Sequence, residues 1–92
     1  MPQARSDLRD VIIYIAQDNP DAAERIEDRI IQATRRLISH PEMGRPGRVP
    51  GTRELVVAST PYVVPYRIRG ERVELLAVIH TARQWPSSFE ST

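Results

Sequence analysis

RELVVASTPYVVPYRIRGERVELLAVIHTARQWP, residues 53–86, decides the fold of this 92-residue chain. It predicts strands at residues 53–57, 62–69 and 72–80, because runs rich in β-branched and aromatic residues are separated by turn formers. Connections this short allow only antiparallel neighbours, since a parallel crossover needs about a dozen residues or more. A small antiparallel meander buries one face at most, so we expect the preceding residues to cover it.

The second and third strands carry different positional signals. Pro65 lies within the second strand and has no backbone N–H to donate, which favours an edge position or a bulge. The third strand is apolar on both faces, so we expect it to be central and covered on both sides. Tyr62 and Tyr66 share one face of the second strand and are expected in the core, with their hydroxyls at its rim.

The covering layer is predicted to be an antiparallel helix hairpin over residues 3–39. Apolar side chains recur at helical spacing over residues 3–18, and Tyr14 among them is interpreted as a packing residue. Asn19 is a good N-cap for the second helix, and Pro20 suits its first position. The second helix has a narrow apolar seam of Ala23, Ile26, Ile30, Ala33 and Leu37. Its charged residues are most simply a solvated, salt-bridged face, formed by Arg25, Glu27, Asp28, Arg29, Arg35 and Arg36.

Residues 40–52 are expected to form a loop, because they contain three prolines and three glycines. Such a segment is either an ordinary connector or a binding loop beside a rigid sheet. The whole chain is thus predicted to be one α+β domain. Its parts are a helix hairpin (3–39), a loop (40–52), a β-meander (53–80) and a polar tail (81–92).

Composition excludes several classes of function. The chain has no cysteine, so disulfides and thiol chemistry are excluded, and two histidines are too few for a convincing metal site. We expect no cofactor, no membrane association and a cytoplasmic location, because no apolar run approaches about 18 residues and no signal peptide is recognisable. Residues 1–42 carry six arginines and eight acids (net −2), whereas residues 43–92 carry seven arginines and four acids (net +3). This asymmetry is either an arginine bias or a surface for phosphates or carboxylates.

Several short motifs, in this order and spacing, resemble the RelE/ParE superfamily, the toxins of bacterial type II toxin–antitoxin modules. The resemblance runs from about Pro2 to Pro86 and rests on the helix hairpin, on sequence motifs and on their order. The motifs are Asn19-Pro20-Asp21-Ala22-Ala23, Pro41-Glu42-Met43-Gly44-Arg45, Arg53-Glu54-Leu55, Pro61-Tyr62-Val63-Val64-Pro65-Tyr66-Arg67-Ile68 and His80-Thr81-Ala82-Arg83-Gln84-Trp85-Pro86.

The family usually opens with a short strand before the first helix, and here that strand is expected to be absent. The predicted first helix starts abruptly, because only Met1 precedes Pro2 and Met is a poor N-cap. Either the start is shortened or the fold lacks this strand, which would leave a sheet edge unpaired that a partner chain could fill.

The resemblance implies two alternative activities. RelE-like members cut mRNA on the ribosome, which requires a proton acceptor, a cation for the phosphate and a proton donor. The strand cores here lack the expected basic cluster, which leaves Arg83, His80 and Glu54 as catalytic candidates. We therefore favour the ParE branch, whose members resemble RelE in fold but poison DNA gyrase. A degenerate, non-toxic binding module is the third hypothesis.

Arginines dominate the residues expected to contact a target or partner. The resemblance places a functional arginine at Arg83, whereas an exposed salt bridge is the simpler alternative. Trp85 is either a partner anchor or a residue that closes the core. The full set of candidate binding residues is Arg83, Trp85, Arg53, Arg45, Arg48 and Arg67.

The resemblance also implies a set of partners. A cognate antitoxin is expected to bind in a hetero-oligomer, over the exposed parts of the hairpin and the arginine-bearing edge of the sheet. DNA gyrase, or the ribosome with its mRNA, is the expected target. No direct DNA binding is expected without the antitoxin.

Overall fold

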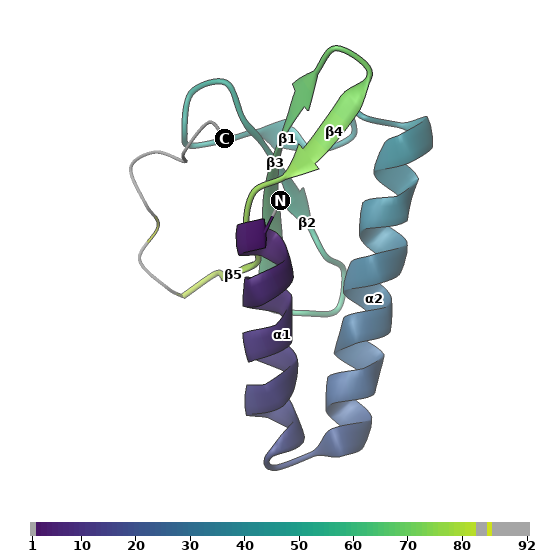
Figure 1. Cartoon of the computed structure of the whole chain (residues 1–92), viewed down its shortest axis with the longest axis vertical. Helices are drawn as coiled ribbons and strands as arrows, with labels where there is room; N and C mark the ends of the chain where they lie inside the picture. The colour runs from purple at the N-terminus through teal and green to yellow at the C-terminus, as the bar shows by residue number, and fades with distance from the viewer. Residues whose placement is uncertain (1, 83–84, 86–92) are drawn as a thin grey trace.

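The computed structural model describes residues 2–82 and residue 85, which form two helices packed on a five-stranded antiparallel sheet (Figure 1). The predicted α+β architecture, a helix hairpin on a small antiparallel sheet, is confirmed. The helices are α1 (Pro2–Ala16) and α2 (Pro20–Ser39), and the strands are β1 (Arg45–Pro46), β2 (Arg53–Val56), β3 (Tyr62–Arg69), β4 (Arg72–Leu75) and β5 (Ile79–His80).

Asn19 makes the tight turn of the helix hairpin. Its backbone N–H donates to the carbonyl of Ile15 at 2.9 Å, which closes α1. Its side-chain oxygen accepts from the N–H of Ala22 at 3.0 Å, which caps α2. The two helices consequently lie side by side over the sheet (Figure 1).

Strand β3 is the centre of the sheet, and this corrects the predicted strand order. The strands run β1-β2-β3-β4, and β5 pairs with β3 on the same side as β4. The predicted third strand, residues 72–80, is therefore two short strands, and within the described residues it lies at an edge. The expectation that it is central was wrong: Leu76, Ala77, Val78 and Ile79 are buried, but no further strand of the described residues pairs beside them.

Pro65 explains why that strand is interrupted. It lies within central β3, so of the two predicted alternatives, an edge position or a bulge, the edge position is excluded. It is paired in register with Glu54 of β2. On the other side, the N–H of Leu76 donates to the Pro65 carbonyl at 2.9 Å, and Pro65 has no N–H to return. Two residues further along the chain, the N–H of Val78 donates a hydrogen bond of 3.0 Å to the carboxylate of Asp7 on α1.

The main core lies between the helices and one face of the sheet. Its central residue is Tyr66, which is fully buried. The predicted seam of α2 is confirmed at four positions, but Tyr14 is 72% exposed, so its predicted packing role was wrong. The buried cluster consists of Ile30, Ala33, Leu37, Leu55, Val57, Tyr62, Val64, Tyr66 and Val78.

The segment 40–52 is more ordered than the predicted loop, because β1 within it pairs with β2. Buried Tyr66 fastens its first half: the hydroxyl donates to the Pro41 carbonyl at 2.7 Å and accepts from the Gly44 N–H at 2.9 Å. A Cβ at Gly44 would lie 2.6 Å from the Tyr66 ring, so only glycine fits this close approach. Arg53 adds a hydrogen bond of 2.8 Å to the Gly44 carbonyl.

Candidate functional site

The candidate site is the sheet face that points away from the helices. Cross-strand partners share a face, and alternate residues of a strand lie on opposite faces. Tyr66 faces the helices, so its neighbours Pro65 and Arg67 face the other way. Glu54 and Glu74 are paired with those two residues, so they lie on the outer face as well.

Glu54 is the hub of a cluster on this face. Its carboxylate is only 3% exposed, although it belongs to a charged residue. One oxygen accepts from Nη2 and Nε of Arg45, at 2.9 and 3.1 Å. The other accepts from the backbone N–H and the Nε of Arg48, at 2.9 and 3.1 Å. Four donors thus saturate the carboxylate and tie β1 and the following turn to β2.

The Glu54 carboxyl is held in its ionised form. Burial alone would raise its pKa, but the hydrogen bonds from the Arg48 backbone and from the side chains of Arg45 and Arg48 outweigh burial. The net effect is a pKa below the usual range. A carboxylate that is ionised, buried and fully bonded has no lone pair free to take a proton from a substrate.

A second ion-pair cluster lies on the same face, near the β3–β4 turn. Arg67 Nε donates to Glu74 at 2.7 Å, and Arg69 Nε lies 3.5 Å from the same oxygen. The Arg67 bond, and the charges of Arg67, Arg69 and Arg72, lower the pKa of Glu74 against a smaller opposing effect of burial. Three arginines surround one acid here, so the cluster is a net cation.

His80 lies apart from Glu54. It is paired with Tyr62 at the far end of β3, and its ring meets the Tyr62 ring edge-on at 5.4 Å between centroids. Its Nδ1 accepts from the N–H of Ala82 at 3.0 Å. Among the interactions that join described residues, none connects His80 with Glu54, so the two candidate catalytic groups are not brought together.

The remaining candidates divide between the two faces. Arg53 faces the helices, and its guanidinium is committed to the carbonyls of Glu42 and Gly44. Trp85 is half-buried and packs under Arg48, whose guanidinium carbon lies 3.8 Å from the ring centroid. Arg83, the most favoured position in the sequence, lies outside the described residues.

The outer face can therefore attract anions, but its described part shows no assembled acid–base pair. Its two acids, Glu54 and Glu74, are already paired with arginines. The arginines in this part of the face are Arg45, Arg48, Arg67, Arg69 and Arg72. The described part of the chain holds no group of three histidines or acids fit for a metal, and none of its helices is long and apolar enough to cross a membrane.

Sequence reasoning missed two features of the site. Glu54 was considered only as a proton carrier, and its contacts with Arg45 and Arg48, which hold the segment 45–48, were not anticipated. A pocket between α2 and the β2–β3 turn was missed completely, because its arginines belong to the helix face interpreted as merely solvated. The signal for that pocket was the spacing of Arg29 and Arg36, seven residues apart and hence on one face of a helix.

Comparison with known protein families places the chain among the toxins of type II toxin–antitoxin systems. Residues 1–85 match the family described as "ParE toxin of type II toxin-antitoxin system, parDE", and the chain belongs to that family. The resemblance inferred from the sequence motifs is thus confirmed.

Individual relatives agree with this assignment. The chain is 49% identical to a protein named toxin Y4kP from Sinorhizobium fredii, over 86% of this chain and 81% of that one. It is 37% identical to toxin RelE2 from Caulobacter vibrioides, over 88% and 90% of the two chains. A solved structure described as a chromosomal ParDE toxin–antitoxin system from P. aeruginosa has the same fold, with a TM-score of 0.79, 24% identity, and coverage of 87% of this chain and 89% of that one.

Proposed function

We propose that this ParE-family toxin arrests growth by binding and poisoning DNA gyrase, and that a cognate antitoxin neutralises it. In this proposal the toxin performs no chemistry of its own. It acts as a protein ligand that presents a basic surface to its target. No cofactor is required for binding of this kind.

The observation that carries the proposal is the state of Glu54. A ribonuclease on this face needs a group that accepts the proton of the 2′-hydroxyl. Glu54 is an ionised carboxylate with four donors bound, and His80 lies at the other end of β3. This arrangement favours recognition over catalysis.

We assign the contact with the target to Arg83 and to the arginines of the outer face. Trp85 supports that surface, because its stacking on Arg48 ties the end of the described chain to the Glu54 cluster. Replacing Arg83 by alanine should abolish growth arrest and leave folding intact. Arg25→Ala on the exposed face of α2 is the matched control, because it removes the same charge far from the outer face. Unchanged toxicity of R83A would remove Arg83 from the site.

An RNA-cutting activity is the second candidate, and the relationship with toxin RelE2 favours it. In this case Arg83 would stabilise the phosphate in the transition state, and His80 or Glu54 would move protons. The variant H80A discriminates the two functions when it remains folded. A ribonuclease that moves protons through His80 should lose most of its activity in H80A, whereas a gyrase-binding toxin should still arrest growth. E54Q does not discriminate by itself, because Glu54 also holds Arg45 and Arg48 of the outer face.

The test is induction of the chain in bacteria, with and without the neighbouring reading frame, followed by inspection of DNA and transcripts. We expect growth arrest that the neighbour relieves, with an SOS response, gyrase-dependent DNA breaks and intact mRNA. Transcripts cut at the ribosomal A site, with intact DNA, would instead support the ribonuclease. Absence of any growth effect would favour a binding module without toxicity.

A further inference from the structure

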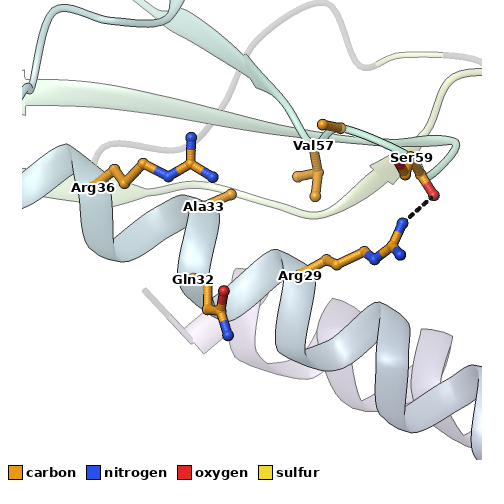
Figure 2. Close-up of a pocket in the computed structure, with 7 residues that line it drawn as sticks. Arg29, Gln32, Ala33, Arg36, Val57 and Ser59 are labelled. Carbon is orange, nitrogen blue, oxygen red and sulfur yellow. Dashed lines mark hydrogen bonds between the residues drawn. The ribbon is translucent and has the colours of Figure 1, made fainter.

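A pocket of about 210 Å³ lies between α2 and the turn that joins β2 to β3, on the side of the molecule that carries the helices (Figure 2). Its walls combine a small apolar floor with polar groups at the rim. Val57 and Ala33 are buried beneath it. The lining residues are Arg29, Gln32, Ala33, Arg36, Val57, Ala58 and Ser59.

Two guanidiniums dominate the electrostatics of this pocket. Arg29 and Arg36 are two turns apart on one face of α2, and Figure 2 shows both on the side that faces the β2–β3 turn. No acid lines the pocket, and no carboxylate in the described part of the chain forms an ion pair with either arginine. The pocket is therefore a site of unneutralised positive charge.

Most donors of the two arginines remain available for a ligand. Arg29 Nη1 makes one long hydrogen bond of 3.3 Å to the Ser59 carbonyl, which steadies its side chain at the rim (Figure 2). A guanidinium carries five N–H donors in a planar fork that matches a carboxylate. Gln32 also lines the pocket, and its amide is an uncharged donor. A carboxylate in the pocket would thus be met from two sides.

The size and surroundings of the pocket decide which anion it fits. Pockets that hold drug-sized ligands are usually about 300–1,000 Å³, so this smaller one suits a single side chain. Residues 1–42 carry a net charge of −2, and the acids Glu24 and Asp28 are exposed on the same helix as Arg29. These acids oppose the approach of a polyanion such as a nucleic acid more strongly than that of a single carboxylate on a protein chain.

We propose that this pocket binds the carboxylate of a glutamate or aspartate side chain presented by the antitoxin. The inference rests on the proposed function, in which an antitoxin neutralises the toxin. It adds the toxin residues that would recognise the antitoxin. The apolar floor accommodates the methylene part of the acid, and Arg29 and Arg36 bind its oxygens. The contact would contribute to the specificity of the pair and would weaken with salt.

The first arm of the test uses small probes and the free toxin. Backbone amides of residues 57–59 and the Nε–H of Arg36 are followed by NMR while N-acetylglutamate amide or inorganic phosphate is added. We expect saturable shifts with the glutamate probe in the wild type and in Arg35→Gln, and none in the double variant R29Q/R36Q. Arg35 is the matched control, since it is an exposed arginine of α2 that does not line the pocket. Shifts with phosphate alone, or with neither probe, would overturn the proposal.

The second arm measures binding of the antitoxin. R29Q/R36Q should bind it at least 10-fold more weakly than the wild type and with a smaller salt dependence, and R35Q should bind like the wild type. Equal binding by R29Q/R36Q would overturn the proposal. Inhibition of gyrase by the free variants is measured in parallel. A toxin that binds its antitoxin through this pocket but does not inhibit gyrase would contradict the proposed target and leave the inference about the pocket intact.

Discussion

At the scale of single residues, Glu54 is a charged residue with a structural role. A carboxylate 3% exposed would be costly to bury alone, but four hydrogen bonds from Arg45 and Arg48 compensate. The same bonds position Arg48 above Trp85. The charge therefore stabilises the segment 45–48 and, through it, the outer face.

Replacing Glu54 by glutamine tests this role. The amide keeps one acceptor but brings an NH₂ group against arginine donors, so we expect a loss of about 1–3 kcal/mol in the free energy of unfolding. Urea unfolding followed by circular dichroism measures the change. Glu71→Gln is the control, because Glu71 is exposed in the β3–β4 turn and should unfold with the wild-type midpoint. Equal midpoints for E54Q and the wild type would show that the cluster contributes no stability.

Acid should destabilise the protein through the same group. The folded-state pKa of Glu54 lies below its unfolded value, so its contribution is present above the unfolded pKa and is lost as the pH falls through the folded pKa. The unfolded value is about 4.3, so we expect stability to decline below about pH 5. Glu74 contributes in the same direction. In urea titrations at several pH values, E54Q should show a shallower decline than the wild type; parallel curves would contradict the assignment.

Tyr66 gives a second test, because its hydroxyl is both donor and acceptor inside the core. Tyr66→Phe leaves the Pro41 carbonyl and the Gly44 N–H without this partner, so we expect a loss of about 1–3 kcal/mol. Tyr14→Phe removes the same atom from a side chain that is 72% exposed, and should leave thermal unfolding unchanged. Similar melting temperatures for the two variants would refute the bridging role.

At the scale of elements, local sequence signals predicted the helices well. The Asn19-Pro20 pair and the apolar seam of α2 correctly predicted the helix hairpin. Strand β3 matches the predicted residues 62–69. The third strand was harder, because its apolar alternation runs unbroken from 72 to 80. Its interruption depends on Pro65 of the neighbouring strand and on Asp7 of α1, and these are contacts between distant residues. Composition alone also failed to predict β1, because this short strand forms by pairing with β2.

The helix hairpin depends on its cap. Asn19→Ala removes the side-chain acceptor for the Ala22 N–H, and we expect a loss of about 1 kcal/mol. Gln17→Ala, at an exposed position of the same turn, serves as the control. Urea midpoints of the two variants measure the difference, and a cap variant as stable as the wild type would mean that packing alone sets the hairpin.

At the scale of the whole molecule, two basic surfaces lie on different sides of one small domain. The outer sheet face carries the Glu54 and Glu74 clusters, and the pocket of Arg29 and Arg36 lies over the β2–β3 turn beside α2. The sequence analysis proposed candidate binding residues but did not anticipate this division. Arg53 shows why: it is adjacent to Glu54 in the chain, yet strand alternation puts it on the opposite face, where it fastens a loop.

The most direct test of the proposed target is a supercoiling assay with purified gyrase, relaxed plasmid DNA and this toxin. We predict inhibition of supercoiling with accumulation of cleaved DNA, both prevented by prior addition of the antitoxin and absent with R83A. A toxin that leaves gyrase fully active, yet cuts mRNA in a purified translation reaction, would contradict the account.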